Sequence, residues 1–158
     1  MELNAEVFSQ FDRKWALVCA GTLEHHNAMT ISWGGLGTLW SRPVATVYVK
    51  PVRHTYGFME ESDWFTVSFY GEEYRRALEV MGTTSGRDTD KDGAAGLTPV
   101  AAGEGVTYAQ AEVTLLCRKI YRQDLDTAHM PPEVVDTYYR IEAAHRMYVG
   151  EVVDVIRK

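Results

Sequence analysis

Residues Asn27 to Trp40 read NAMTISWGGLGTLW, an alternating strand pattern that runs into a cluster of glycines. Bulky apolar residues alternate with small ones, and two of the small ones are the hydroxyl residues Thr30 and Ser32. Hydroxyls beside bulky apolar side chains can line a ligand site, and glycine lets a ligand approach the backbone closely. The stretch therefore predicts a strand and a glycine-rich bend that together hold a flat ligand with a polar edge.

The chain on both sides of this stretch carries further strand patterns and two short helical ones. The predicted strands are rich in β-branched and aromatic residues, and they cover Lys14–Thr22, Asn27–Trp33, Val44–Val49, Trp64–Tyr70, Val106–Arg122 and His145–Ile156. Gly150 is the expected bulge in the last strand. The predicted helices cover Arg53–Glu61, which Thr55 or a residue around it is expected to cap, and Glu72–Met81, which Gly82 is expected to end. We expect a loosely structured entry at residues 1–13 and loops at Leu39–Pro43 and 83–105.

This order of elements predicts a mainly β protein with short helices. Strands and helices do not alternate regularly, which argues against a doubly wound parallel sheet. The expected architecture is an antiparallel sheet closed into a barrel, with helices at one side. The chain has 158 residues, no internal repeat and no linker, so residues 1–158 are expected to form a single domain.

Charge and apolar content restrict the partners. The net charge is −6 and no long basic run is present, which argues against a nucleic-acid or membrane-surface partner. The N-terminus lacks a signal-peptide pattern, and the longest apolar run, Trp15 to Gly21, is too short to span a bilayer. We therefore expect a cytoplasmic protein. Cys19 and Cys117 match no zinc or redox spacing and are expected to be buried thiols.

Several familiar catalytic motifs are absent. The glycines near Trp40 lack the third glycine of a Rossmann fingerprint, and residues 82–87 lack the Gly-Lys-Ser/Thr of a P-loop. No G-x-S-x-G elbow is present. His25 and His26 are adjacent, so their side chains point apart on a strand and no metal site is predicted. If the protein is an enzyme, a bound cofactor is expected to perform the chemistry.

Two segments have the composition of an anion site. Arg53 and Thr55 stand where a strand gives way to a helix, and helix N-termini bind anions. The alternative is a surface arginine beside a capping threonine. The loop from Ser85 to Lys91 offers a hydroxyl and two cations. Ser85 and Lys91 could join Arg53 around one phosphate, or the loop is a solvated turn. His145 heads the last strand and could hydrogen-bond a substrate or deliver a proton.

Six motifs in sequence resemble the flavin reductase-like, FMN-binding split-barrel family, and its flavoredoxin-like branch is the most similar. They are N-x-M-T-I-S-W-G, R-P-V-A-T-V-Y-V-K-P-x-R-x-T, F-T-V-S-F, G-T-x-S-G-R-D-x-D-K, A-G-L-T-P and H-R-M-Y-V-G-E-V. The resemblance as a whole runs from about Trp15 to Val153. The resemblance implies a split β-barrel that forms a homodimer, with one FMN per subunit near the dimer interface. Trp40 is a candidate contact between subunits.

The resemblance also implies roles for individual residues. The isoalloxazine ring and ribityl chain would be lined by Asn27, Thr30, Ile31, Ser32 and Trp33. The same wall would continue towards the phosphate through Lys50, Arg53, His54 and Thr55, and the phosphate or ribityl chain would be covered by Ser85, Gly86 and Lys91. His145 would lie near the reacting face of the flavin.

The expected function is that of an FMN-dependent oxidoreductase. Electrons would pass from NADH or NADPH through bound FMN to free flavin, a metal complex or a partner protein. Two alternatives stay open at this point: a flavoredoxin-type electron carrier without its own NAD(P)H turnover, and a flavin or haem storage or sensing protein.

Overall fold

The computed structural model describes residues 6–158. The elements follow one another in the order α1 (Glu6–Asp12), β1 (Ala16–Gly21), β2 (His26–Ile31), β3 (Gly34–Leu39), β4 (Arg42–Val49), α2 (His54–Glu61), β5 (Trp64–Phe69), α3 (Arg75–Thr83), α4 (Lys91–Ala95), β6 (Pro99–Ala102), β7 (Gly105–Tyr108), β8 (Val113–Asp124), α5 (Pro132–Tyr138) and β9 (Arg146–Arg157). Short 3₁₀ turns precede α3, at Glu72–Tyr74, and α5, at Thr127–His129. None of the helices in this part of the chain is long and apolar enough to span a membrane.

Seven strands form one antiparallel sheet in the order β2-β1-β5-β8-β9-β4-β3, and β6 and β7 form a separate hairpin. The mainly β, antiparallel architecture predicted from the sequence is confirmed. The sheet is not closed, because β2 and β3 are its two edges and do not pair with each other. Only Ser32 and Trp33 separate these two strands along the chain. The sheet must therefore curl until its edges approach each other, which gives a split barrel.

Two hydrophobic cores pack against opposite faces of the sheet. One gathers side chains of the curled sheet and of α2, among them Val18, Val47 and Phe65. The other lies under α3, α4 and the β6–β7 hairpin and includes Leu17 and Leu78. Strand β1 contributes alternate residues to both cores, which explains why its sequence, ALVCAG, is apolar throughout.

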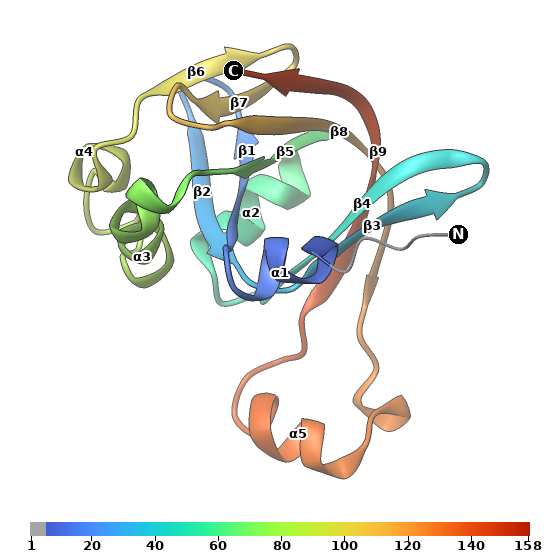
Figure 1. The fold of residues 1–158 in the computed structure, drawn as a ribbon. Helices are drawn as coiled ribbons and strands as arrows, with labels where there is room; N and C mark the ends of the chain where they lie inside the picture. Colours follow the sequence, from blue (N-terminus) through green and yellow to red (C-terminus); the bar gives the residue numbers. More distant parts are fainter. Residues whose placement is uncertain (1–5) are drawn as a thin grey trace.

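The segment between β8 and β9 leaves the sheet as an arm. Figure 1 shows that residues 125–145, which contain α5, project away from the sheet at the end of the β8–β9 ribbon. Lys50, at the end of β4, holds this arm: its Nζ donates to Glu142 Oε2 at 2.8 Å and to the Tyr138 carbonyl at 3.1 Å. The arm therefore lies beside the end of β4 and the β2–β3 connection.

The glycine-rich part of the opening stretch is a strand and not a bend. Strand β3 pairs with β4 from Gly34 to Leu39, so the predicted loop at Leu39–Pro43 is wrong. The turn is only Trp40 and Ser41, with positive φ values of 52° and 59°. Two consecutive left-handed residues match the twist of a tight hairpin. Because glycine has no side chain, the alternation typical of a strand cannot be recognised in this part of the sequence. Pairing with β4 stabilises the strand.

Three further segments differ from expectation. Helix α1 covers Glu6–Asp12 in the predicted loose entry, whose residues 1–5 lie outside the described chain. Helix α4 and strand β6 lie within the predicted loop 83–105. The single strand expected over Val106–Arg122 is two strands, β7 and β8, because a turn at residues 109–112 separates them. These elements are short, and their tertiary partners decide their conformation.

The structure refines three predictions about single residues. Arg53, two residues before Thr55, is the N-cap of α2, and Thr55 itself accepts a hydrogen bond from Asn27. Helix α3 continues past Gly82 to Thr83; a Cβ at Gly82 would lie 3.1 Å from Thr30 Cβ. Gly150 is paired with both neighbouring strands, β4 and β8. The register of the β8–β9 pair shifts at the pair of residues next to it.

Candidate functional site

Two adjoining pockets form a groove beside the β2–β3 connection, and both are lined by Val52 and Arg53. The first, here called the polar pocket, has a volume of about 210 Å³ and is lined by Asn27, Val52, Arg53, His54, Thr55, Gly82, Thr83, Thr84, Ser85, Arg87 and Lys91. The second, here called the aromatic pocket, has a volume of about 420 Å³ and is lined by Met29, Thr30, Ile31, Ser32, Trp33, Tyr48, Lys50, Val52, Arg53, Tyr138, Glu142 and His145.

The structure brings the predicted site residues together in this groove. Every one of them lines a pocket except Gly86, which lies against the wall of the polar pocket. A Cβ at Gly86 would lie 2.1 Å from Asn27 Oδ1 and 3.3 Å from the His54 ring. The missing side chain therefore allows the loop after α3 to approach β2 and α2 closely.

Buried hydrogen bonds shape the floor of the polar pocket. Asn27 is 6% exposed and Thr55 1%, and Asn27 Nδ2 donates to Thr55 Oγ1 at 2.7 Å. This bond joins β2 to the first turn of α2. Helix α2 begins at the pocket, so its N-terminal partial positive charge lies there.

Two cations in the polar pocket are held by the end of α3. Arg53 Nη2 donates to the Gly82 carbonyl at 3.1 Å, and Lys91 Nζ donates to the Met81 carbonyl at 3.1 Å. Lys91 is only 5% exposed. Within residues 6–158 neither cation forms an ion pair with a carboxylate. The pocket therefore holds positive charge that the protein itself does not pair.

The pKa values of two groups in the polar pocket are lowered by this arrangement. Burial and the neighbouring charge of Arg53 lower the pKa of Lys91 to about 8. Burial and the charges of Arg87 and Lys91 also lower the pKa of His54. Both groups lose affinity for their protons because they are removed from water and because the site is already positive. An anionic group bound there would reverse this effect.

Aromatic rings dominate the second pocket. Trp33 meets Tyr138 edge to face, with ring centroids 5.0 Å apart, and lies 5.3 Å from the ring of His145. The hydroxyl of Tyr139 is hydrogen-bonded to His145 Nδ1 at 2.8 Å. Burial and the charge of Lys50 lower the pKa of His145 to about 4. His145 is therefore a neutral imidazole at physiological pH.

Two further predicted residues also have partners in the protein. The Thr30 hydroxyl donates to the Leu78 carbonyl of α3. The Lys50 ammonium is engaged by Glu142 and the Tyr138 carbonyl, as described above. Thr30 and Lys50 therefore shape the groove, whereas Arg53 and Lys91 supply its unpaired charge.

The sequence did not single out several lining residues. Tyr138 and Glu142 come from the arm, where no strand or helix pattern had been recognised. Tyr48 alternates with buried residues along β4 and could have been recognised by that alternation. Thr84 and Arg87 stand within the same loop motif as Ser85. Residues 6–158 contain no group of three or more His, Cys, Asp or Glu side chains that could hold a metal ion.

Comparisons with known proteins identify the family and the fold. Residues 8–158 match the family model of the flavin reductase like domain. No curated protein matches the sequence.

Solved structures show the same fold at low identity. A flavoredoxin from Methanosarcina acetivorans superposes with a TM-score of 0.74 at 18% identity, covering 100% of this chain and 75% of that one. An FMN-binding protein from Thermus thermophilus, with bound p-hydroxybenzaldehyde, gives 0.72 at 21%, covering 91% and 71%. An NADH:FAD oxidoreductase from Streptomyces globisporus gives 0.72 at 17%, covering 97% and 80%.

Proposed function

The chain belongs to the flavin reductase-like family, and from this premise we propose that it is an FMN-dependent oxidoreductase. In this proposal NADH or NADPH supplies the electrons, and free flavin, a metal complex or a partner protein receives them. Bound FMN would supply the redox chemistry, since its ring accepts a hydride and passes electrons on.

The observation that carries the proposal is the unpaired charge of Arg53 and Lys91 at one end of an aromatic groove. FMN has the matching polarity, with a phosphate dianion at one end and a flat ring at the other. The polar pocket offers two cations and the start of α2 to the phosphate. The aromatic pocket offers the rings of Trp33 and His145 to the flavin end.

The remaining predicted residues divide between the two ends. Asn27, Thr30, Ile31, Ser32 and Trp33 are proposed to line the ring and ribityl chain, with Lys50 holding the arm against them. The proposed phosphate residues are Arg53, His54, Thr55, Ser85, Gly86 and Lys91. His145 is the proposed catalytic residue: its neutral ring can accept or donate a proton near the reacting atoms.

An electron carrier without nicotinamide turnover is the second candidate. The exposed ring of Trp33, at 40%, leaves one wall of the aromatic pocket open to a protein partner. Flavoredoxins are also among the structural neighbours. Steady oxidation of NADH or NADPH, at about 1 s⁻¹ or faster, would favour the reductase over the carrier.

The first test is the visible spectrum of the purified protein with added FMN, followed by anaerobic addition of NADH. We expect a shifted flavin spectrum and its bleaching by NADH. Arg53→Ala should weaken FMN binding by about 1.5–3 kcal/mol, the usual value of a charge-assisted hydrogen bond, whereas Arg157→Ala, at the exposed end of β9, should not. A spectrum that FMN leaves unchanged would refute the proposal.

We also propose that the protein is a cytoplasmic, single-domain homodimer. Trp40 at the tip of the β3–β4 hairpin is 61% exposed and makes an edge contact with Tyr121 of β8. An exposed tryptophan on a rigid hairpin is typical of an interface. Sedimentation of the wild type and of Trp40→Ser tests this assignment: a monomeric wild type would contradict it.

A further inference from the structure

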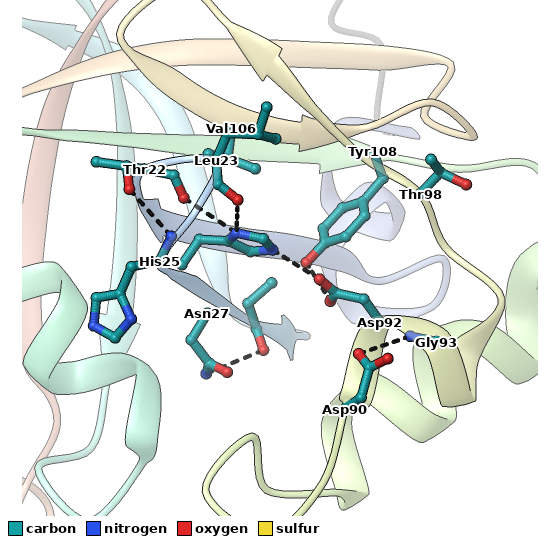
Figure 2. Close-up of polar contacts among 12 residues, drawn as sticks. Thr22, Leu23, His25, Asn27, Asp90, Asp92, Gly93, Thr98, Val106 and Tyr108 are labelled. Atoms are coloured by element: carbon teal, nitrogen blue, oxygen red, sulfur yellow. Dashed lines mark hydrogen bonds and ion pairs between the residues drawn. The ribbon is translucent and has the colours of Figure 1, made fainter.

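A partly buried ion pair lies beside Tyr108 of the second core, outside the groove. His26, the first residue of β2, has its Nε2 2.7 Å from Asp92 Oδ2 in α4. The other carboxylate oxygen of Asp92 accepts a hydrogen bond from the Tyr108 hydroxyl at 2.7 Å (Figure 2). The side chains of His26 and Asp92 are 11% and 19% exposed. Three separate elements, β2, α4 and β7, are thus joined through one carboxylate.

The partners of His26 select its charged form. Its Nδ1 lies 3.1 Å from the carbonyl oxygens of both Thr22 and Leu23, and its Nε2 faces the Asp92 carboxylate. Carbonyls and carboxylates only accept hydrogen bonds, so both ring nitrogens must carry hydrogen to satisfy them. Asp92 in turn is supported as an anion by the Tyr108 hydroxyl.

The ionisable groups around the pair favour the same state. The hydrogen bond with Asp92 raises the pKa of His26, although burial opposes it. Burial opposes ionisation of Asp92 as well, but the hydrogen bonds from His26 and Tyr108 lower its pKa. Burial and Asp92 raise the pKa of Cys19, and Lys91 stands next to Asp92 in the chain. The thiol is therefore neutral beside a charged pair.

The pair stands directly behind the polar pocket. His26 is followed by Asn27, and Asp92 is preceded by Lys91; Asn27 and Lys91 both line the pocket. Helix α4 contains only five residues, Lys91–Ala95. A helix of this length does not hold itself together, so its position depends on tertiary contacts such as the one that Asp92 makes.

We propose that His26, Asp92 and Tyr108 are positioning residues that clamp α4 against β2 and thereby hold Lys91 in place for the phosphate of FMN. The inference rests on the proposed role of the polar pocket. Because only protonated His26 can donate to Asp92 and to the backbone carbonyls at the same time, the clamp is complete at acidic pH and weakens as the proton is lost.

The direction of the pH dependence follows from linkage. A raised pKa of His26 in the folded protein means that the clamp is fully present below the ordinary value of about 6.5 and is lost as pH rises through the raised value. FMN affinity should therefore fall as pH increases. Lys91, with a pKa of about 8, also loses charge in this direction, so variants must separate the two groups.

Two substitutions separate the ring from the carboxylate. His26→Gln keeps an N–H donor towards Asp92 that does not titrate, so the position of α4 should become independent of pH. Asp92→Asn removes the negative charge that favours protonated His26, and its amide can turn either its oxygen or its N–H towards the ring. In this variant α4 should be less protected than in the wild type at pH 6 and should depend little on pH. His129→Gln is the control. His129 also lies beside an aspartate, with its Nε2 3.7 Å from Asp126 Oδ2, but its side chain is 84% exposed.

The primary measurement is amide hydrogen exchange of residues 91–97 in the protein without FMN, from pH 6 to 9, corrected for intrinsic rates. We expect protection of α4 to fall about tenfold or more in the wild type and the control, to stay constant in His26→Gln, and to be low and nearly constant in Asp92→Asn. FMN titrations should show an affinity loss of about tenfold, or 1.4 kcal/mol, in Asp92→Asn at pH 6.

The outcomes separate the clamp from the proposed function. Equal protection of α4 in the wild type and Asp92→Asn at every pH would overturn the clamp, even if FMN binds normally. If α4 follows the predicted pH dependence but FMN does not bind, the proposed cofactor fails, and with it the role of the clamp in phosphate binding.

Discussion

Lys91→Met removes the charge of the buried lysine while keeping most of its side-chain volume. In the wild type, burial and the nearby Arg53 lower the pKa of Lys91 from 10.5 to about 8. At about 1.36 kcal/mol per pH unit, this difference disfavours the charged form by about 3 kcal/mol at pH 7. Loss of the hydrogen bond to the Met81 carbonyl offsets about 1–2 kcal/mol of that. We therefore expect the variant without FMN to be about 1–2 kcal/mol more stable than the wild type.

The pH dependence of the stability provides a second, independent test of this reasoning. Between pH 8 and pH 10.5 the unfolded chain keeps the lysine proton that the folded protein has lost. Stability rises with pH wherever the unfolded state binds more protons, so this group stabilises the wild type progressively over that range. The advantage of Lys91→Met at pH 7 should therefore shrink at pH 9.5. Urea unfolding followed by tryptophan fluorescence at the two pH values measures the change.

FMN binding should move in the opposite direction to stability. Loss of one charge-assisted contact should weaken binding by about 1.5–3 kcal/mol. Lys119→Met is the matched control: Lys119 Nζ also donates to a backbone carbonyl, that of Met59, and its pKa is also lowered by burial, but it lies outside the groove. A Lys91→Met variant that is less stable at pH 7, or whose stability difference does not change with pH, would refute the reasoning.

Three further predictions concern the sheet, the loop and the proposed catalytic residue. Gly150→Ala should lower the free energy of unfolding by about 1–3 kcal/mol, measured by urea denaturation, because its Cβ would lie 2.6 Å from the Phe65 ring. Gly86→Ala should weaken FMN binding at least as much as it lowers stability, since its Cβ would displace Asn27; unchanged affinity would show that this contact is not needed. NAD(P)H oxidation should show no titration of His145 between pH 5 and 8, because its pKa is about 4; histidine NMR checks the assignment.

Alternation allowed the sequence to predict most strands. Trp64–Phe69 and Arg42–Val49 carry β-branched and aromatic residues in the period of a strand, and both were recognised within two residues of their ends. Strand β3 was missed, because three of its six residues are glycine. Its stability comes from pairing with β4, which is a property of the assembled sheet and not of the local sequence.

The convergence of Arg53, Ser85 and Lys91 was an expectation drawn from their chemistry, and the structure places them in one pocket. The contacts of Lys50 with the arm could not be predicted from the sequence. Its partner Glu142 lies 92 residues away, in an arm that carries no periodic pattern. Long-range contacts of this kind depend on the topology of the fold, whereas the spacing of a motif gives information only about residues that are close together in the sequence.

The place of the aromatic pocket follows from one topological constraint. Strands β2 and β3 stand at opposite ends of a seven-stranded sheet, and flat strands about 4.8 Å apart would separate them by almost 30 Å. Yet only Ser32 and Trp33 connect them, and three Cα steps span at most about 11 Å. The sheet must curl to close this gap, so the backbone at Ser32 and Trp33 is held in place by the whole sheet. The aromatic end of the groove is therefore built on a connection that the whole sheet constrains, whereas Lys91 at the polar end depends on the five residues of α4 and their contacts.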